Sequence, residues 1–138
     1  MATIEVRVVS AERELFTGQA SMVLAPAAMG EVGIAPKHSP LLTRLKPGEV
    51  RVKTADGEQL YFFVSGGLLE VQPHLVTVMA DTALRAKDAD EAAAADAKRA
   101  AEEAVENAKG EMDLARAQAE LVEAAARLHF VKKLKDIR

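Results

Sequence analysis

The feature that most constrains the fold of this chain is a change in sequence pattern near residue 83. All five prolines, seven of the eight glycines and most of the valine, phenylalanine and isoleucine lie before that point. Alanine dominates after it, with 16 of the 51 residues from 88 to 138. The two parts therefore predict two structural units, a β domain over residues 1–84 and a helical domain over residues 85–138.

The first part carries the alternating pattern of half-buried strands. In residues 49–54, EVRVKT, the two valines are expected on one face and the charged side chains on the other. Asp56-Gly57 then predicts a tight hairpin turn into a strand at residues 60–65. Further strands are expected at residues 4–10, 14–18, 20–25, 68–71 and 75–80. A series of short strands separated by turns predicts an antiparallel β-sandwich or a small barrel.

The second part is rich in strong helix formers. Its first segment opens with Asp and Glu, which favour a helix N-terminus, and its pattern stops between Asn107 and Gly110. The segment from residue 111 onward places five apolar side chains near one stripe, namely Leu114, Leu121, Leu128, Val131 and Leu134. The short break predicts an antiparallel hairpin of two helices, so the expected fold class is α+β.

Alanine is expected to hold the two helices together only weakly. Burial of a leucine side chain is worth about 1.5 to 3 kcal/mol, whereas an alanine methyl group is worth about 0.8 kcal/mol. A docked and an undocked hairpin can then differ by only a few kcal/mol, which predicts mobility. A permanently docked hairpin is the alternative, and uniformly high hydrogen-exchange protection along both helices would favour it.

The charge of the chain excludes a general attraction to nucleic acid or to an anionic membrane. The formal net charge is -3 and the pI is about 5.7. Residues 88–127 contain eleven acidic and five basic residues, whereas four basic residues gather near the end of the chain: Lys132, Lys133, Lys135 and Arg138. This basic end is either a solvated surface or a contact for an acidic partner.

The sequence offers no arrangement of residues that predicts an active site. It has no cysteine, and its three histidines, His38, His74 and His129, lack the spacing of a metal site. Neither a phosphate-binding GxxxxGK[ST] loop nor a GxSxG motif occurs. The first residues lack the apolar core of a signal peptide, and no run approaches the roughly 18 apolar residues that span a bilayer.

Four stretches resemble, in order, the epsilon subunit of bacterial F-type ATP synthases. They are VVSAERELFTG at 8–18, GEVGIAPKHSPLL at 30–42, KPGEVRV at 46–52 and VSGGLLEVQPHLVTVMADTA at 64–83. The resemblance implies a sandwich of about ten strands followed by two helices, in agreement with the periodicity. It also implies a non-catalytic rotor subunit, peripheral on the cytoplasmic side of the bacterial inner membrane.

The resemblance implies three groups of partners. The sandwich is expected to bind the gamma subunit and to sit on the polar loops of the membrane c-ring. The two helices are expected to swing into an extended form that reaches the alpha and beta subunits and blocks ATP hydrolysis.

Each of these contacts is expected at particular residues. The c-ring contact is expected at Glu31, Val32, Gly33 and His38, in a loop at the c-ring end where Glu31 meets a basic residue of the ring. The gamma contact is expected at Ser10, Glu12 and Leu15. The contact with alpha and beta is expected at Arg127, Lys132, Lys133, Lys135 and Arg138.

The ATP site of some family members is degraded in this chain. Their motif of Ile or Leu, Asp, two variable residues, Arg and Ala aligns with residues 89–94, ADEAAA, in which only Asp90 and the last alanine agree. Arg99 and Arg127 fall where that site has basic residues, but Glu123 stands where another arginine is expected. Each lost arginine removes charge-assisted hydrogen bonds worth about 1.5 to 3 kcal/mol. We therefore expect weak or absent ATP binding and no required cofactor.

Two other classes of protein stay open. A sandwich enzyme with a helical extension would need clustered acid, base or metal-binding residues, and tight metal binding at His38 or His74 would favour it. An adaptor would use the basic C-terminal helix to bind a partner or an anionic surface, and salt-dependent binding to liposomes or DNA would favour that reading.

Overall fold

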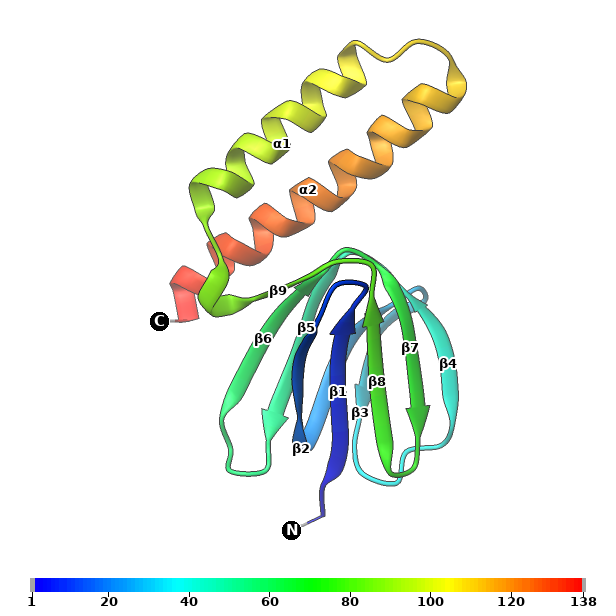
Figure 1. The fold of residues 1–138 in the computed structure, drawn as a ribbon, viewed down its shortest axis with the longest axis vertical. Coiled ribbons are helices and arrows are strands. Elements are labelled where there is room, and N and C mark those ends of the chain that lie inside the picture. The colour runs from blue at the N-terminus through cyan, green and yellow to red at the C-terminus, as the bar shows by residue number, and fades with distance from the viewer. Residues whose placement is uncertain (1, 138) are drawn as a thin grey trace. The chain divides into compact units, whose positions relative to one another are not determined.

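The computed structural model describes the backbone of residues 2–137 and the side chains of residues 2–135. The chain divides into two compact units, Met1–Lys87 and Asp88–Arg138. Nine strands lie in the described part of the first unit, and two helices form a hairpin in the second (Figure 1). The predicted class, a β-sandwich followed by a helical hairpin, is confirmed.

The strands of the first unit form one continuous, folded sheet. They are β1 (Ile4–Ser10), β2 (Glu14–Ala27), β3 (Gly30–Ile34), β4 (Leu41–Leu45), β5 (Gly48–Thr54), β6 (Gln59–Val64), β7 (Gly67–Gln72), β8 (Leu75–Ala80) and β9 (Ala83–Arg85), followed by a short 3-10 helix, η1 (Ala86–Asp88). The order of hydrogen-bonded strands is β1-β8-β7-β4-β2-β5-β6-β9, with β3 paired to β2. Only the β1–β8 pair is parallel among the pairings described.

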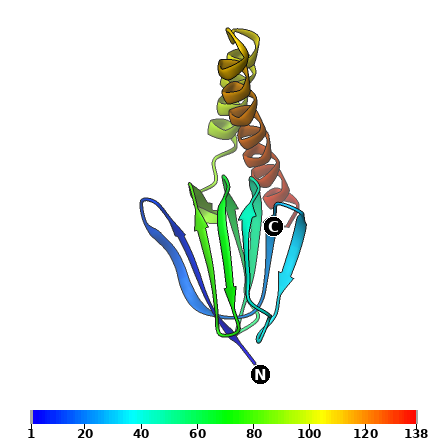
Figure 2. The same ribbon diagram turned by 90° about the vertical axis from the view of Figure 1, so that its right-hand side faces the viewer.

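Strand β2 links the two layers of the sandwich. Its first part pairs with β1, and its later part pairs with β3 and β5. One layer therefore contains β1, β8, β7 and β4, and the other contains β3, β5, β6 and β9, as the two perpendicular views show (Figures 1 and 2).

The apolar core lies between these layers and comes from alternate residues along each strand. Val50 and Val52 of β5 are fully buried, as the alternating pattern predicts. The same alternation buries Val6 and Val8 of β1. Every residue of the buried cluster lies between residues 4 and 80, so the first unit has a core of its own.

Three strands, β3, β4 and β9, lie where the sequence pattern did not indicate them, and β9 crosses the predicted domain boundary between residues 84 and 85. Both β3 and β4 fall within the stretch 30–45, and the predicted strands at 14–18 and 20–25 are parts of the single long strand β2. Burial alternates along both β3 and β4, but each strand has only five residues and only its last one, Ile34 or Leu45, is fully buried, so the alternation leaves a weak sequence pattern.

Two glycines have backbone conformations that other residues rarely adopt. Gly57 has a φ of 88° in the β5–β6 turn and donates its N–H to the carbonyl oxygen of Thr54 at 3.0 Å, as expected for a tight hairpin. Gly67 begins β7 with a φ of 134° and pairs with Ala80 of β8. A Cβ atom on Gly67 would lie 2.0 Å from the carbonyl oxygen of Met79, closer than atoms can approach.

The second unit consists of α1 (Glu91–Glu106) and α2 (Glu111–Ile137). Its buried alanines recur every seven residues, at Ala94 and Ala101 of α1 and at Ala117 and Ala124 of α2. Of the predicted apolar stripe, Leu128, Val131 and Leu134 are buried, whereas Leu114 is 37% exposed. The alanines therefore form the seam toward the hairpin turn. Within the described chain, neither helix is long and apolar enough to cross a membrane.

Candidate functional sites: interaction surfaces of the two units

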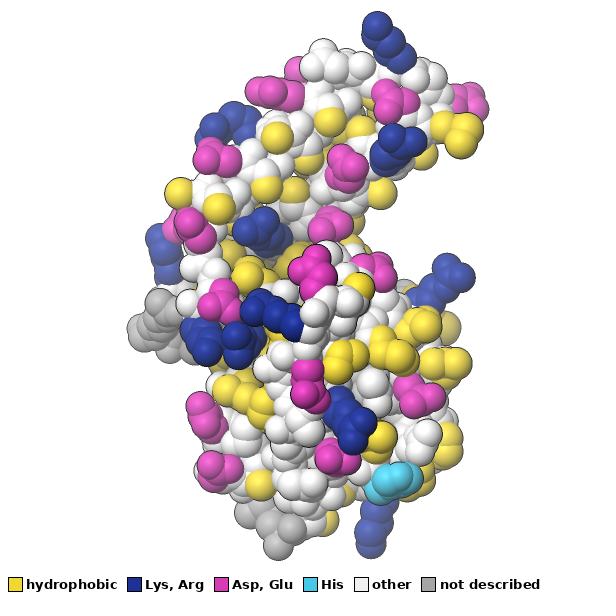
Figure 3. Space-filling view, viewed as in Figure 1, with side chains coloured by type: hydrophobic (Ala, Val, Ile, Leu, Met, Phe, Trp, Pro, Cys, Tyr) yellow, Lys and Arg dark blue, Asp and Glu magenta, His cyan; other side chains and the backbone are white. Residues whose placement is uncertain are grey.

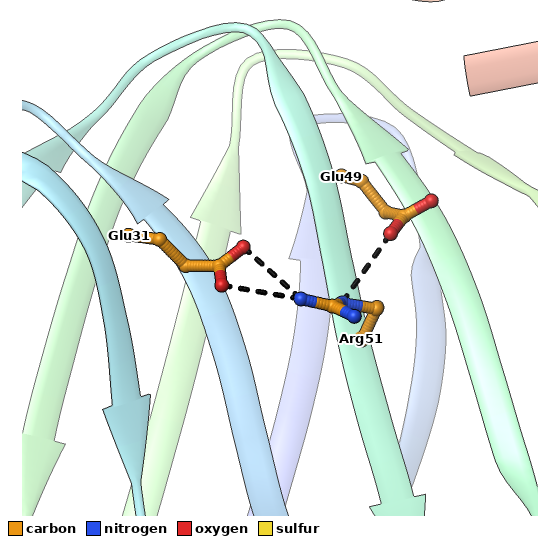
Figure 4. A network of polar contacts seen from close by, with 3 residues as sticks. All are labelled: Glu31, Glu49 and Arg51. Atoms are coloured by element: carbon orange, nitrogen blue, oxygen red, sulfur yellow. Dashed lines mark hydrogen bonds and ion pairs between the residues drawn. The ribbon is translucent and has the colours of Figure 1, made fainter. Parts of the chain in front are cut away.

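An ion-pair cluster lies on the outer face of the layer that contains β3 and β5. Arg51 of β5 donates from Nη2 to both carboxylate oxygens of Glu31, at 3.1 and 3.2 Å (Figure 4). Its Nε lies 3.4 Å from Oε1 of Glu49. Arg51 reaches Glu31 across β2, since Leu24 of β2 is opposite both Arg51 and Gly33. One cation on this surface thus contacts two carboxylates.

The predicted c-ring residues lie in two places. Glu31, Val32 and Gly33 are consecutive residues of β3, whereas His38 lies in the loop that follows the end of that strand. His38 Nδ1 is 2.7 Å from the carbonyl oxygen of Ser39, and the preceding residue, Lys37, donates its N–H to the carbonyl oxygen of Pro73 at 3.1 Å.

The interpretation of residues 31–40 as one loop is therefore wrong for residues 31–34. Backbone pairing with β2 makes them a strand. The c-ring contact itself stays a prediction. In the part of the chain that is described, no three His, Cys, Asp or Glu side chains gather as metal ligands.

The turn between β2 and β3 exposes a large apolar side chain close to Glu31. Met29 is 100% exposed, two residues before Glu31. Neither Met29 nor Arg51 was identified from the sequence. Two sequence signals could have identified them: Met29 is an apolar residue within a turn, and Arg51 is a cation on the charged face of a strand.

Part of the outer face of the other layer is apolar, although Arg44 of β4 lies opposite Leu68 and Glu70 of β7 lies opposite Leu42 on the same face. Val9, Met79 and Leu68 lie side by side on β1, β8 and β7. Leu68 is 42% exposed and Leu42 of β4 is 66% exposed. We call these four residues the apolar outer face; Figure 3 shows apolar side chains gathered on this part of the sandwich. A shallow hollow of about 390 Å³ is lined by Val9, Leu68 and Met79 together with Ser10.

The predicted gamma-contact residues do not share one surface. Ser10 ends β1 beside the apolar outer face, and its Oγ accepts from the N–H groups of Glu12 and Arg13, both at 3.3 Å. Glu12 is exposed in this turn. Leu15 is only 7% exposed and belongs to the core. The gamma contact stays a prediction. Of the three residues, Ser10 and Glu12 can take part in it through their side chains.

A hollow of about 370 Å³ lies between the two helices. It is lined by Ala97, Ala100, Ala101, Glu120, Glu123, Ala124 and Arg127. The Nε atom of Arg127 is buried and has no hydrogen-bond acceptor among the described residues. The floor of the hollow is therefore alanine, and its charged groups are two carboxylates and one guanidinium.

The other two residues of the predicted ATP-site remnant have local partners in α1. Asp90 is the N-cap of α1, and its Oδ1 accepts from the N–H of Ala93 at 3.2 Å. Arg99 forms an exposed ion pair with Asp96 at 3.1 Å. Neither lines the hollow that contains Arg127. The three residues of the predicted ATP-site remnant, Asp90, Arg99 and Arg127, therefore do not line one hollow.

The basic end of α2 is partly matched by acidic groups of the hairpin. Lys135 forms an ion pair with Glu91 of α1, while Lys132 and Lys133 are exposed. Arg138 lies outside the described residues. Acidic and basic side chains are interspersed over the visible face of the hairpin (Figure 3). The predicted contact with alpha and beta subunits stays untested.

Sequence comparison assigns both units. The model of the ATP synthase delta/epsilon chain β-sandwich domain matches residues 3–86, and that of the long α-helix domain matches residues 82–132. The chain belongs to the ATP synthase delta/epsilon chain family. The ATP synthase epsilon chain of Nitrosococcus oceani is 60% identical over 133 residues, 96% of this chain and 95% of the relative. That of Halorhodospira halophila is 60% identical over 136 residues, 98% of this chain and 96% of the relative.

Chains in two solved mitochondrial ATP synthase structures have the same fold. A chain in the cryo-EM structure of Euglena gracilis mitochondrial ATP synthase has a TM-score of 0.78 at 19% identity, covering 91% of this chain and 79% of that chain. A Tetrahymena thermophila mitochondrial ATP synthase chain has a TM-score of 0.62 at 17% identity, with coverages of 93% and 96%. The resemblance to the epsilon subunit is confirmed, and the chain is classed with non-catalytic epsilon chains of the ATP synthase.

Proposed function

We propose that this chain is a rotor subunit of a proton-translocating F-type ATP synthase. In this role it couples a gamma subunit to a c-ring and slows ATP hydrolysis through its helical unit. The observation that carries the proposal is the match of both family domains, in order, to residues 3–132. The chain would work on the cytoplasmic side of a bacterial inner membrane, held there through the c-ring.

The c-ring contact is proposed at the β2–β3 hairpin. Glu31 is an exposed carboxylate within this hairpin, and Met29 at its tip is fully exposed. An acidic group beside an exposed apolar group suits a polar loop that carries a basic residue, since charge sets the register and the apolar group adds buried area.

The gamma contact is proposed at the apolar outer face together with Ser10. This face joins exposed leucines on β4 and β7 to half-buried residues on β1 and β8. Contiguous exposed apolar surface is typical of protein–protein contacts. Ser10 and Glu12 lie at the end of β1 that borders it.

ATP hydrolysis by an epsilon-depleted bacterial catalytic complex tests the inhibitory role. We expect the full chain to slow hydrolysis severalfold, and residues 1–87 to bind without slowing it, because the blocking contact is assigned to the helices. The shorter chain keeps β9 paired with β6 and retains the complete buried core. It is therefore a better control than a chain that ends at residue 83.

The outcomes separate the parts of the proposal. If both chains bind and neither slows hydrolysis, the helical unit has no inhibitory role and the chain serves in coupling only. If neither chain binds the complex, the rotor assignment itself fails. Co-purification with the catalytic complex measures binding in each case.

We also propose that the chain does not respond to ATP. A triphosphate in the hollow between the helices would meet Glu120 and Glu123, and Arg127 is the one cation among the described residues that line it. The negative charges of these two carboxylates would repel an anionic ligand in the hollow. Calorimetry is expected to detect no binding in the micromolar range. Glu123→Arg replaces a carboxylate by a phosphate-binding group and should strengthen binding, whereas micromolar affinity of the unaltered chain would contradict the proposal.

A further inference from the structure

The Glu31 carboxylate is held in place by another residue of the same unit. Glu31 is 55% exposed, a degree at which a glutamate side chain ordinarily samples several rotamers. Arg51 restricts it with two hydrogen bonds from one nitrogen, at 3.1 and 3.2 Å. Arg51 is itself 31% exposed and is fixed on its other side by the ion pair with Glu49 at 3.4 Å.

We propose that Arg51 is a positioning residue for the c-ring contact of Glu31. The inference rests on the proposed function, in which Glu31 meets a cationic side chain of the ring. Arg51 orders the carboxylate before the partner arrives, so that less side-chain entropy is lost when the contact forms. Arg51 does not itself touch the partner and acts through Glu31.

The cluster keeps the charge that such a contact needs. Two carboxylates share the guanidinium of Arg51, so Arg51 does not fully neutralise Glu31 and the attraction to a cation remains. A carboxylate has about four lone-pair sites, and Arg51 occupies two of those on Glu31. The remaining lone pairs can accept hydrogen bonds from an incoming ammonium or guanidinium group.

A competing role for Arg51 makes the opposite prediction. If Arg51 only neutralised Glu31, its removal would take a positive charge from beside Glu31 and strengthen attraction to a cation. Positioning and neutralisation therefore predict changes of opposite sign for the same substitution. The sign of the change in affinity decides between them.

The test rebuilds the catalytic complex with each variant and measures its affinity for membrane vesicles that retain the c-ring. Proton pumping per ATP hydrolysed is measured on the same samples. We expect Glu31→Gln to weaken binding about tenfold, as for loss of a charged hydrogen bond. Arg51→Gln should weaken it about three- to tenfold, because the glutamate is no longer ordered. Lys53→Gln removes a neighbouring exposed charge on β5 and should leave the affinity unchanged.

The double variant Glu31→Gln with Arg51→Gln should bind no more weakly than Glu31→Gln alone. A residue that acts through Glu31 has nothing to position once the carboxylate is gone, whereas losses from a general effect on folding would add. Urea unfolding of each isolated variant measures that general effect directly.

Three results would overturn the inference in distinguishable ways. Tighter binding of Arg51→Gln would show that Arg51 competes with the partner. An unchanged affinity of Arg51→Gln, or losses that add in the double variant, would show that it does not act through Glu31. No change for Glu31→Gln itself would instead remove the proposed c-ring contact, and the positioning role with it.

Discussion

Replacement of Gly67 by alanine is expected to destabilise the sandwich by about 3 to 5 kcal/mol. The new Cβ would lie 2.0 Å from the carbonyl oxygen of Met79 and 2.9 Å from Cα of Ala80. Both atoms belong to the backbone of β8, so relief requires movement of a central strand. The φ of 134° adds conformational strain for any residue other than glycine.

Gly57→Ala is the matched control for this substitution. Gly57 also has a positive φ, of 88°, but no atom lies within 4 Å of the position that a Cβ would occupy. Only the conformational cost remains, about 1 to 2 kcal/mol. Urea unfolding followed by the fluorescence of Tyr61, the one tyrosine of the chain, reports on the sandwich. Equal losses in the two variants would argue against the close approach of β7 and β8.

Enlargement of a seam alanine is expected to loosen the helical hairpin. Ala94 is 0% exposed and does not line the hollow between the helices. In Ala94→Leu the extra atoms have no space at the seam, and overpacking of this kind costs about 1 to 3 kcal/mol. Hydrogen exchange along α1 and α2 should then accelerate about 5- to 150-fold.

Ala119→Leu is the control for the hairpin because it makes the same change at an exposed position of α2. Alanine and leucine have similar helix propensities, so exchange should be nearly unchanged. If Ala94→Leu also leaves exchange unchanged, the alanine seam does not limit hairpin stability. In the rebuilt catalytic complex, a loosened hairpin should spend more time undocked, and hydrolysis should then be slower than with the unaltered chain.

The fold was predictable from the sequence where burial makes apolar residues recur at a regular spacing. Val50 and Val52 alternate with charged residues on β5, and alanine-rich segments with a polar break predict the hairpin. Strands β3 and β4 were not predictable in this way, since each is short and buries mainly its last residue. Backbone pairing holds β3 against the neighbouring strand β2 and β4 against the distant strand β7. Backbone hydrogen bonds use groups that nearly all residues share, so they produce no recognisable pattern in the sequence.

The candidate sites were predictable only in part, for a related reason. Glu31 was found through the family resemblance, but Arg51 is 20 residues away and reaches it only because β2 lies between β3 and β5. Leu15 was assigned to a contact surface, yet the strand pattern turns it inward. An aspartate directly before a helical segment is a common N-cap, and Asp90 has this role in the structure.

The parallel pairing of β1 with β8 has a consequence for how the chain is made. Glu5 is opposite Leu75, 70 positions later in the chain. At about 5 to 20 residues per second on the ribosome, β1 waits several seconds for its partner strand to be synthesised. The helical hairpin, in contrast, is built from contacts between neighbouring segments, and local contacts of that kind form quickly. The apolar side of the first strand is thus exposed to the cell for longer than any part of the helices, and its protection during synthesis depends on early pairing with β2.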